Sequence, residues 1–206
     1  MVALLAGAWA LRLGLHIVRR TQRGGEDPRY AKLLEEWGGA WRFRLFLFLQ
    51  IQAAAALLLT VSIFLAARNP ATGWQWSDLA GLLILLAAVC GEGLADSQLT
   101  RFRRAPANSG KVCDTGLWAL SRHPNYFFQW LGWTGYSVIA IGPSGLWIWG
   151  WVALAGPAFM YWLLVHVSGI PPLEAHMMRS RGIAFASYAS RVNAFWPGLK
   201  NKEKPT

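Results

Sequence analysis

The chain has 206 residues, enough for one domain, and 54% of them are hydrophobic, including 13 tryptophans. Lys and Arg number 20 against 10 Asp and Glu, which gives a formal net charge of +10. The two cysteines, Cys90 and Cys113, exclude a disulfide framework and have no metal-binding spacing, so no bound metal is expected.

Five long apolar runs predict the fold class, because most are near the ~20 residues that a helix needs to cross a bilayer. They predict an all-α protein, a polytopic membrane helix bundle of about five transmembrane helices plus short cytosolic helices, as one integral membrane domain over 1–206. The first run begins abruptly at Met1, which predicts further upstream sequence, and it ends in Arg-Arg without a signal-peptide cleavage site. The runs cover roughly 2–18, 43–67, 79–99, 125–141 and 145–167.

The basic residues predict the side of the membrane on which each loop lies. Nearly all Lys and Arg lie in three segments, 19–44, 101–122 and 179–204. Five alternating spans place these segments on one side and the weakly charged loops near 68–78 and 142–144 on the other. The positive-inside rule assigns the basic loops and the C-terminus to the cytosol. Membrane lipids are the expected partners of these charges, and nucleic acid is not.

In chain order, the first cytosolic segment contains a predicted short helix. Asp27 is a suitable N-cap before Pro28 at the first helical position, and the helix is expected to reach about Trp37. The second apolar run carries two amide side chains, Gln50 and Gln52, which are unusual in a span.

The third run ends in the sequence GEGLADSQLTRFRR. Glu92, Asp96 and Arg103 share one helical face within it, because they lie four and seven residues apart. A carboxylate facing lipid is costly, so this face is expected to point toward a polar partner in the protein. A functional site is one interpretation. A structural ion pair with Arg103 or Arg122 is the other.

A turn-rich loop carrying Lys111 leads into SRHPNYFFQWLGW, which passes directly from a polar loop to an aromatic helix. Arg122 has the planar guanidinium that binds phosphate, and Pro124 suits the first turn of a helix whose free amides attract anions. The stretch therefore predicts an anion-binding mouth with aromatic walls. The alternative is that Arg122 and His123 anchor the helix end to lipid headgroups.

The last segment is interrupted by Gly169 and by Pro171-Pro172, which predict the end of the fifth run. Glu174 follows on a predicted short cytosolic helix near the membrane surface. Three polar segments are thus expected to converge on the cytosolic face, where a charged cofactor would meet an apolar substrate from the lipid. The sequence contains no motif of a soluble dinucleotide fold, a P-loop, a metal centre or a nucleophile elbow.

Three stretches resemble the bacterial membrane family DUF1295, which is related to steroid 5α-reductases, sterol reductases and isoprenylcysteine carboxyl methyltransferases. They are RLGLHIVRRTQRGGEDPRY at 12–30, DTGLWALSRHPNYFFQWLGWTGY at 114–136 and VSGIPPLE at 167–174. The resemblance implies a cofactor-binding part at roughly 92–206. It also implies an NADPH-dependent oxidoreductase acting on a CH-CH bond, similar to a 3-oxo-5α-steroid 4-dehydrogenase. Such an enzyme reduces a conjugated C=C in a steroid-like or other lipidic substrate.

The resemblance also implies site residues. Asp96 and Arg103, seven residues apart, match the acid and the Arg that hold the cofactor in steroid reductases. The expected catalytic set is Gln50 and Gln52, which would meet the substrate, and Tyr126, near the nicotinamide. The expected cofactor-binding set is Glu92, Asp96, Arg103, Lys111, Arg122, His123, Asn125, Trp133, Glu174, Tyr188 and Arg191.

Departures from the related enzymes keep two alternatives open. The substrate-binding Glu of steroid reductases is Ile51 here, and the Gly-acid pair that usually follows Asn-Tyr and one further residue is Phe128-Gln129. One alternative is an S-adenosylmethionine-dependent membrane methyltransferase of the isoprenylcysteine or phospholipid type, which shares R-H-P-x-Y at a span mouth. The other is a non-catalytic membrane protein on the same fold.

Overall fold

The computed structural model of the chain describes residues 1–23 and 38–198, and every regular element in this part is a helix. The all-α prediction is therefore confirmed, while the predicted helix from Pro28 to Trp37 lies outside the described residues. The elements are α1 (Val2–Arg23), η1 (Gly38–Ala40), α3 (Trp41–Ala67), α4 (Trp76–Arg104), η2 (Pro106–Asn108), η3 (Gly116–Ala119), α5 (Pro124–Ile141), α6 (Ile148–Val152), α7 (Ala155–Trp162), the π-helix η4 (Leu163–Val167) and α8 (Ile170–Arg191).

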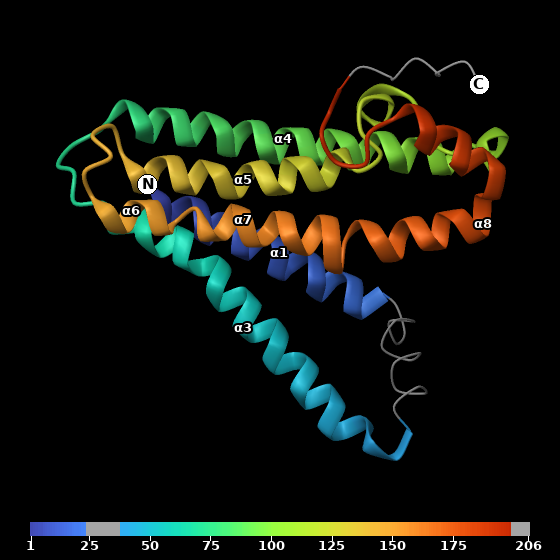
Figure 1. The fold of residues 1–206 in the computed structure, drawn as a ribbon, viewed down its shortest axis with the longest axis horizontal. Coiled ribbons are helices and arrows are strands. Elements are labelled where there is room, and N and C mark those ends of the chain that lie inside the picture. Colours follow the sequence, from blue (N-terminus) through green and yellow to red (C-terminus); the bar gives the residue numbers. More distant parts are fainter. Residues whose placement is uncertain (24–37, 199–206) are drawn as a thin grey trace.

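The described helices run back and forth between the two ends of a bundle. α1, α3, α4, α5 and the α6–α7 pair alternate in direction along its long axis (Figure 1). Three stretches in the described residues are long and apolar enough to cross a membrane, Gly38–Ala67, Trp76–Arg104 and Ile148–Arg191. α5 has 18 residues and a length of about 27 Å, close to the ~30 Å hydrocarbon thickness of a bilayer. A polytopic helical membrane protein is the architecture that results.

The two ends of the bundle differ in charge. The turns at 68–75 and 142–147 lie at the same end as the N-terminus (Figure 1), and the exposed Arg68 is the one basic residue in these turns. The last turn of α4, with the basic residues Arg101, Arg103 and Arg104, lies at the opposite end together with η2, η3 and α8. The arrangement agrees with the segregation of basic loops that the sequence predicts.

α4 and α5 pack closely because glycines lie in their contact. A Cβ atom on Gly81 would lie 2.4 Å from Ile139 Cγ1 and 2.7 Å from the carbonyl oxygen of Gly135. A Cβ atom on Gly91 would lie 2.3 Å from the ring of Phe128. Small residues allow helix backbones to approach in lipid, where association depends on van der Waals contact. This packing holds the first turns of α5 against the C-terminal part of α4.

Pro157 explains why the fifth pass is divided into pieces. Proline has no N–H, and its ring conflicts with the carbonyl group four residues earlier, so the helix breaks between α6 and α7. The carbonyl oxygen of Ala153 instead accepts hydrogen bonds from Ser62 Oγ at 2.6 Å and Ser137 Oγ at 2.8 Å. Both hydroxyls are buried, and they satisfy this carbonyl internally, as a lipid environment requires. The run 145–167 thus forms α6, α7 and η4 instead of one continuous helix.

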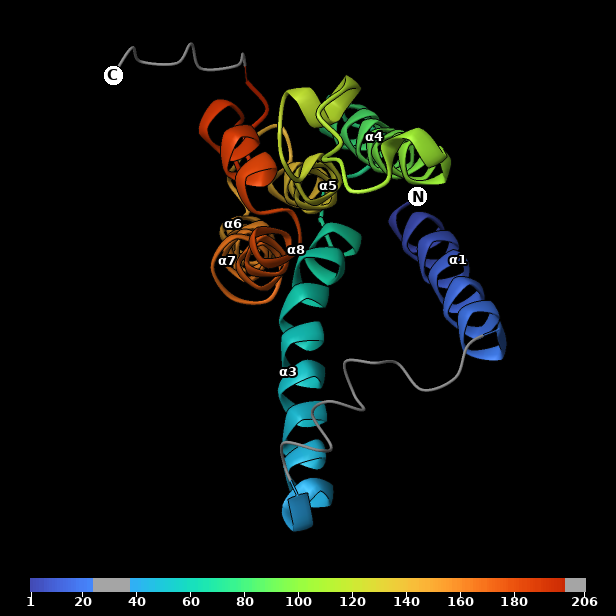
Figure 2. The same ribbon diagram turned by 90° about the vertical axis from the view of Figure 1, so that its right-hand side faces the viewer.

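α3 packs on the bundle through its C-terminal half. Its buried residues are Ser62, Leu65 and Ala66. Its N-terminal half diverges from the other helices in two perpendicular views (Figures 1 and 2). Gln50 and Gln52 lie on this diverging half and are exposed.

α8 turns back on itself at Gly182, and this turn positions the C-terminal segment. Gly182 has φ 48° and ψ −120°, a backbone conformation that side chains with a Cβ disfavour. A Cβ atom there would meet no atom within 4 Å. Glycine is therefore favoured at this position by its backbone conformation and not by a lack of room for a side chain. Beyond the turn, the chain returns over the start of α5 (Figure 1).

Replacing Gly182 by alanine is expected to lower the free energy of unfolding by about 1–3 kcal/mol, the cost of a strained backbone conformation. Gly93→Ala is the matched control, because Gly93 is an exposed helical residue of α4 whose Cβ would also meet open space. The Gly93→Ala change is expected to raise the free energy of unfolding by up to about 1 kcal/mol, because alanine has a higher helix propensity than glycine. Unfolding in mixed detergent micelles measures both, and two effects of the same sign would contradict the expectation.

Candidate functional site

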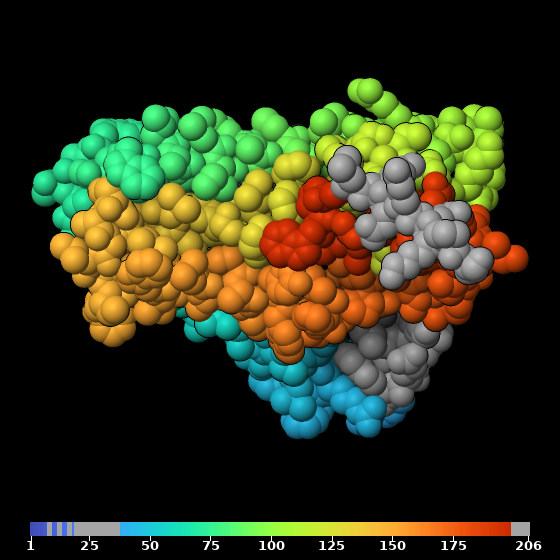
Figure 3. Space-filling model, turned by 45° about the horizontal axis from the view of Figure 1, so that its top comes forward, coloured from blue at the N-terminus to red at the C-terminus, as the bar shows by residue number. Residues whose placement is uncertain are grey.

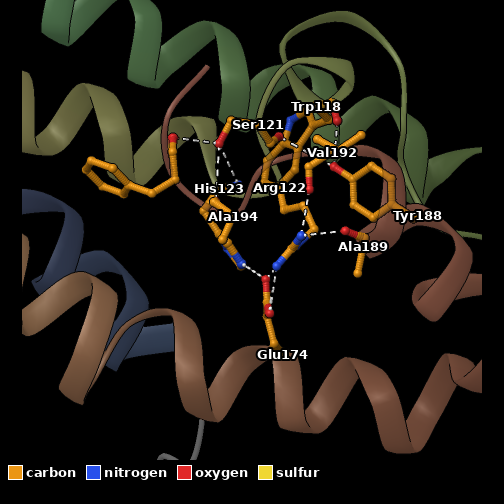
Figure 4. A network of polar contacts seen from close by, with 10 residues as sticks. Trp118, Ser121, Arg122, His123, Glu174, Tyr188, Ala189, Val192 and Ala194 are labelled. Atoms are coloured by element: carbon orange, nitrogen blue, oxygen red, sulfur yellow. Dashed lines mark hydrogen bonds and ion pairs between the residues drawn. The ribbon is translucent and has the colours of Figure 1, made fainter. Parts of the chain in front are cut away.

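Arg122 is the centre of a polar network at the start of α5 (Figure 4). Its Nε donates to Glu174 Oε1 at 2.7 Å and its Nη2 donates to Oε2 at 3.0 Å, which joins the loop before α5 to α8. Its Nη1 donates to the carbonyl oxygens of Ala189 at 2.9 Å and Val192 at 2.6 Å. The guanidinium predicted to bind phosphate thus makes four hydrogen bonds within the protein.

His123 contacts the same carboxylate from a neighbouring position (Figure 4). Its Nε2 lies 3.0 Å from Glu174 Oε1, and its side chain is 5% exposed. Its ring stacks on Tyr126, with 5.5 Å between centroids and 11° between planes. Its buried Nδ1 makes no hydrogen bond to any residue that the structure describes. Glu174 therefore accepts from two side chains at once, which docks α8 onto the start of α5.

Ser121 ties the last described residues to the same loop. Its Oγ donates to the carbonyl oxygen of Phe195 at 2.9 Å. The backbone N–H of Arg122 donates to the carbonyl oxygen of Asn193, also at 2.9 Å. The C-terminal segment, residues 192–198 after α8, consequently lies across α5, as the red atoms in Figure 3 show. The Arg-His motif is held by contacts from both sides, from α8 and from the segment that follows it.

Tyr188 and Trp118 extend the network into a buried core. The Tyr188 hydroxyl donates to the carbonyl oxygen of Trp118 at 2.5 Å, and Trp118 Nε1 donates to the carbonyl oxygen of Ala95 at 2.9 Å. Tyr188 is only 3% exposed. The structure therefore places Tyr188, an expected cofactor residue, where it supports η3 and the loop before α5.

The sequence prediction did not name Ser121, Trp118 or Gln98 as site residues. Gln98 on α4 accepts a hydrogen bond from the backbone N–H of Leu117 at 3.0 Å, which docks η3. Ser121 and Trp118 both lie within GLWALSRHPNY, the sequence on which the resemblance rests. Their presence in that stretch was the available signal.

Asp96 and Asn125 meet across α4 and α5. Asn125 Nδ2 donates to Asp96 Oδ1 at 3.3 Å. Asp96 is exposed, and Asn125 is partly buried. Glu92 lies one helical turn before Asp96 on the same face and is also partly buried. The acidic face of α4 thus has the polar partner that the sequence required, supplied by the first turn of α5.

The remaining expected cations lie on the exposed surface. The side chains of Arg103 and Lys111 are exposed and make no hydrogen bond or ion pair within the described part of the chain. Arg191 Nη2 lies 4.0 Å from Asp114 Oδ2, and its Nε donates to the carbonyl oxygen of Ser187 at 3.2 Å. Arg103 and Lys111 are therefore available to an anionic ligand.

Three other residues that the sequence predicts for the site lie away from both Arg122 and Asp96. Trp133 packs between two core clusters deeper in α5, with its ring 6.1 Å from that of Tyr136. Gln50 and Gln52 lie on the diverging half of α3, as described above. The structure thus gathers Arg122, His123 and Glu174 in one group and Asp96 and Asn125 in a second, and it separates both from the predicted substrate residues.

Comparison with known proteins identifies the family of this chain. The chain matches a family described as "Protein of unknown function (DUF1295)" over residues 1–192. No curated protein and no solved structure matches it significantly. The matched range contains every expected site residue, including the Arg-His motif and Glu174. Because it covers nearly the whole sequence, this chain belongs to the DUF1295 family.

Proposed function

We propose that this chain is a membrane-embedded, NADPH-dependent reductase of a C=C bond conjugated to a carbonyl, in a steroid-like or other lipidic substrate. The observation that carries the proposal is the hydrogen bond of 3.3 Å between Asp96 and Asn125 at the basic end of the bundle. By resemblance, the acid and the Asn match cofactor-binding residues of steroid reductases. The resemblance to steroid reductases supports the same reading by analogy only.

The side chains around this pair suit a dinucleotide. A carboxylate and a carboxamide bind ribose hydroxyls and amide groups, and Arg103 and Lys111 are cations without partners in the described part of the chain. Arg122 has its donors engaged by Glu174 and two carbonyl groups, so we assign it a positioning role. It fixes the start of α5, and with it the position of Asn125, relative to α8 and the residues that follow it.

When bound, NADPH supplies the hydride for the reaction. The protein must orient the alkene and polarise the conjugated carbonyl through a hydrogen-bond donor. Gln52 lies on the diverging half of α3, so it would serve only a substrate that extends away from the Asp96–Asn125 pair to that half. It lies seven residues before Leu59, which packs on the core, and therefore faces nearly the same side of α3. Tyr126 is the other donor in the proposal, held by its stacking on His123.

The proposal includes a location. An inner membrane of bacterial type, with the basic loops and the C-terminus in the cytosol, places Asp96 and Asn125 at the boundary between water and lipid. A water-soluble cofactor reaches this boundary from the cytosol, and an apolar substrate reaches it from the bilayer.

NADPH is expected to raise the unfolding temperature of the detergent-purified protein. A ligand at one hundred times its Kd adds about 2.7 kcal/mol, which corresponds to roughly 5–10 °C for a chain of this size. Arg103→Ala and Asn125→Ala are each expected to reduce the shift. Arg101→Ala is the matched control, because residue 101 lies on the opposite face of α4 from Asp96 and is also exposed.

Differential scanning fluorimetry with NADPH, NADH and S-adenosylmethionine measures these shifts. A rise with S-adenosylmethionine alone would replace the proposal with methyl transfer. The absence of a shift with every cofactor would favour a non-catalytic membrane protein. Equal losses in the Arg101 and Arg103 variants would show that the effect is general charge and not a site.

A further inference from the structure

An apolar cavity of about 380 Å³ lies beside the first turns of α5. Its walls come from three segments of the chain. These are Leu117 and Leu120 before α5, Phe127 and Phe128 on α5, and Trp196 and Pro197 after α8. The volume lies within the about 300–1,000 Å³ that is usual for small-molecule pockets. Neither the Arg122–Glu174 pair nor the Asp96–Asn125 pair lines it, so the cavity is separate from both groups.

Two polar groups next to this cavity make their hydrogen bonds within the protein. The carbonyl oxygen of Leu120 accepts from the backbone N–H of Gly198 at 3.1 Å. The indole Nε1 of Trp130, another wall residue, donates to the carbonyl oxygen of Pro157 at 3.1 Å. A ligand with polar groups would gain little from such walls. The cavity therefore suits a hydrocarbon chain.

The mouth of the cavity indicates the source of that chain. Leu120 is 39% exposed and Trp196 is 49% exposed, so the apolar walls continue onto the outer surface of the bundle, at the end whose loops the sequence predicts to lie at the cytosolic membrane surface. The same end of the bundle carries the basic last turn of α4, with Arg101 and Arg104 exposed. These cations complement the phosphate of an anionic headgroup.

We propose that this cavity binds one acyl chain of an anionic membrane phospholipid, at a site distinct from the reacting centre. The bound chain covers apolar surface of the first turns of α5 and of the C-terminal segment together. It thereby stabilises the docking of that segment beside the Arg-His motif. The proposal does not depend on the nature of the reaction, because no residue of the Asp96–Asn125 pair takes part.

The test is the amount of phospholipid that the purified protein keeps after a delipidating detergent wash, measured by native mass spectrometry. The wild-type chain is expected to retain one phosphatidylglycerol-class lipid. Leu120→Trp places an indole at the mouth and is expected to weaken retention at least about tenfold, because it excludes methylene groups from the cavity. Leu86→Trp is the matched control, since Leu86 is 50% exposed on α4 and does not line the cavity.

A second measurement keeps the test decisive if Leu120→Trp does not fold. Vesicles of phosphatidylglycerol or of phosphatidylcholine, each with a photoreactive acyl chain, are used to label the wild-type protein. Labelling is expected within tryptic peptides 112–122 and 192–200, and more strongly from phosphatidylglycerol. Equal retention in both tryptophan variants, no retained lipid, a retained lipid that is not a phospholipid, or no labelling of these peptides would overturn the proposal.

Discussion

Replacing Glu174 by alanine is expected to lower the free energy of unfolding by up to about 3–5 kcal/mol, the cost of breaking a fully buried ion pair, because Glu174 itself is 23% exposed. Arg122 is 13% exposed and His123 is 5% exposed, so neither side chain regains full hydration when the carboxylate is lost. The change also releases α8 from the start of α5. Glu174→Gln keeps an acceptor without the charge and is expected to give a smaller loss.

The effect of Glu174→Ala is measured by detergent-micelle unfolding, with Arg191→Ala as the control. Arg191 and Asp114 are 31% and 41% exposed and 4.0 Å apart, so this control is expected to cost less than about 1 kcal/mol. A double-mutant cycle with Arg122→Ala isolates the interaction of the pair. Additive losses in that cycle would contradict a direct coupling between Arg122 and Glu174.

Gly81→Leu is expected to cost about 3 kcal/mol or more, because the side chain would overlap α5. The Cβ alone would lie 2.7 Å from the backbone oxygen of Gly135, and a backbone atom cannot move aside as a flexible side chain can. The helices must separate or shift along each other. We therefore also expect weaker cofactor binding, since the same packing brings Asp96 to Asn125.

Gly93→Leu is the matched control for Gly81→Leu. Gly93 lies in the same helix, but its Cβ would meet no atom within 4 Å. This control is expected to change the free energy of unfolding by less than about 1 kcal/mol. The same unfolding assay compares the two variants, and equal losses would show that leucine acts on α4 alone and not on the contact with α5.

Much of the fold was predictable because lipid restricts the possible structures. A span must satisfy its backbone hydrogen bonds internally, so each long apolar run reads as helix. The predicted run 43–67 became α3 (Trp41–Ala67) and the run 79–99 became α4 (Trp76–Arg104). The division of the run 145–167 into several helices was less predictable. The break at Pro157 leaves the carbonyl oxygen of Ala153 without its helical partner, and this oxygen is satisfied by Ser62 and Ser137, which come from other helices.

The candidate site likewise has features that the sequence predicted and features that it did not. Spacing along one helix predicted that the acidic face of α4 needs a polar partner, and Asn125 is that partner. Arg122 was expected to be available to a ligand, and nothing local to SRHPNY indicates that Glu174, 52 residues later, takes its donors. Tyr188 likewise had no sequence signal for burial, because its partner is a carbonyl oxygen 70 residues earlier.

By itself, the sequence determined that the chain is a helical membrane protein, where α1, α3, α4 and α5 begin and end to within about five residues, and which end of the bundle is basic. These properties depend on local hydrophobicity, helix length and charge, which act between residues close in sequence. The tertiary structure alone decided that Arg122 and His123 converge on Glu174 and that α3 diverges from the bundle. Those outcomes depend on hydrogen bonds and packing between distant segments, whose geometry no local pattern specifies.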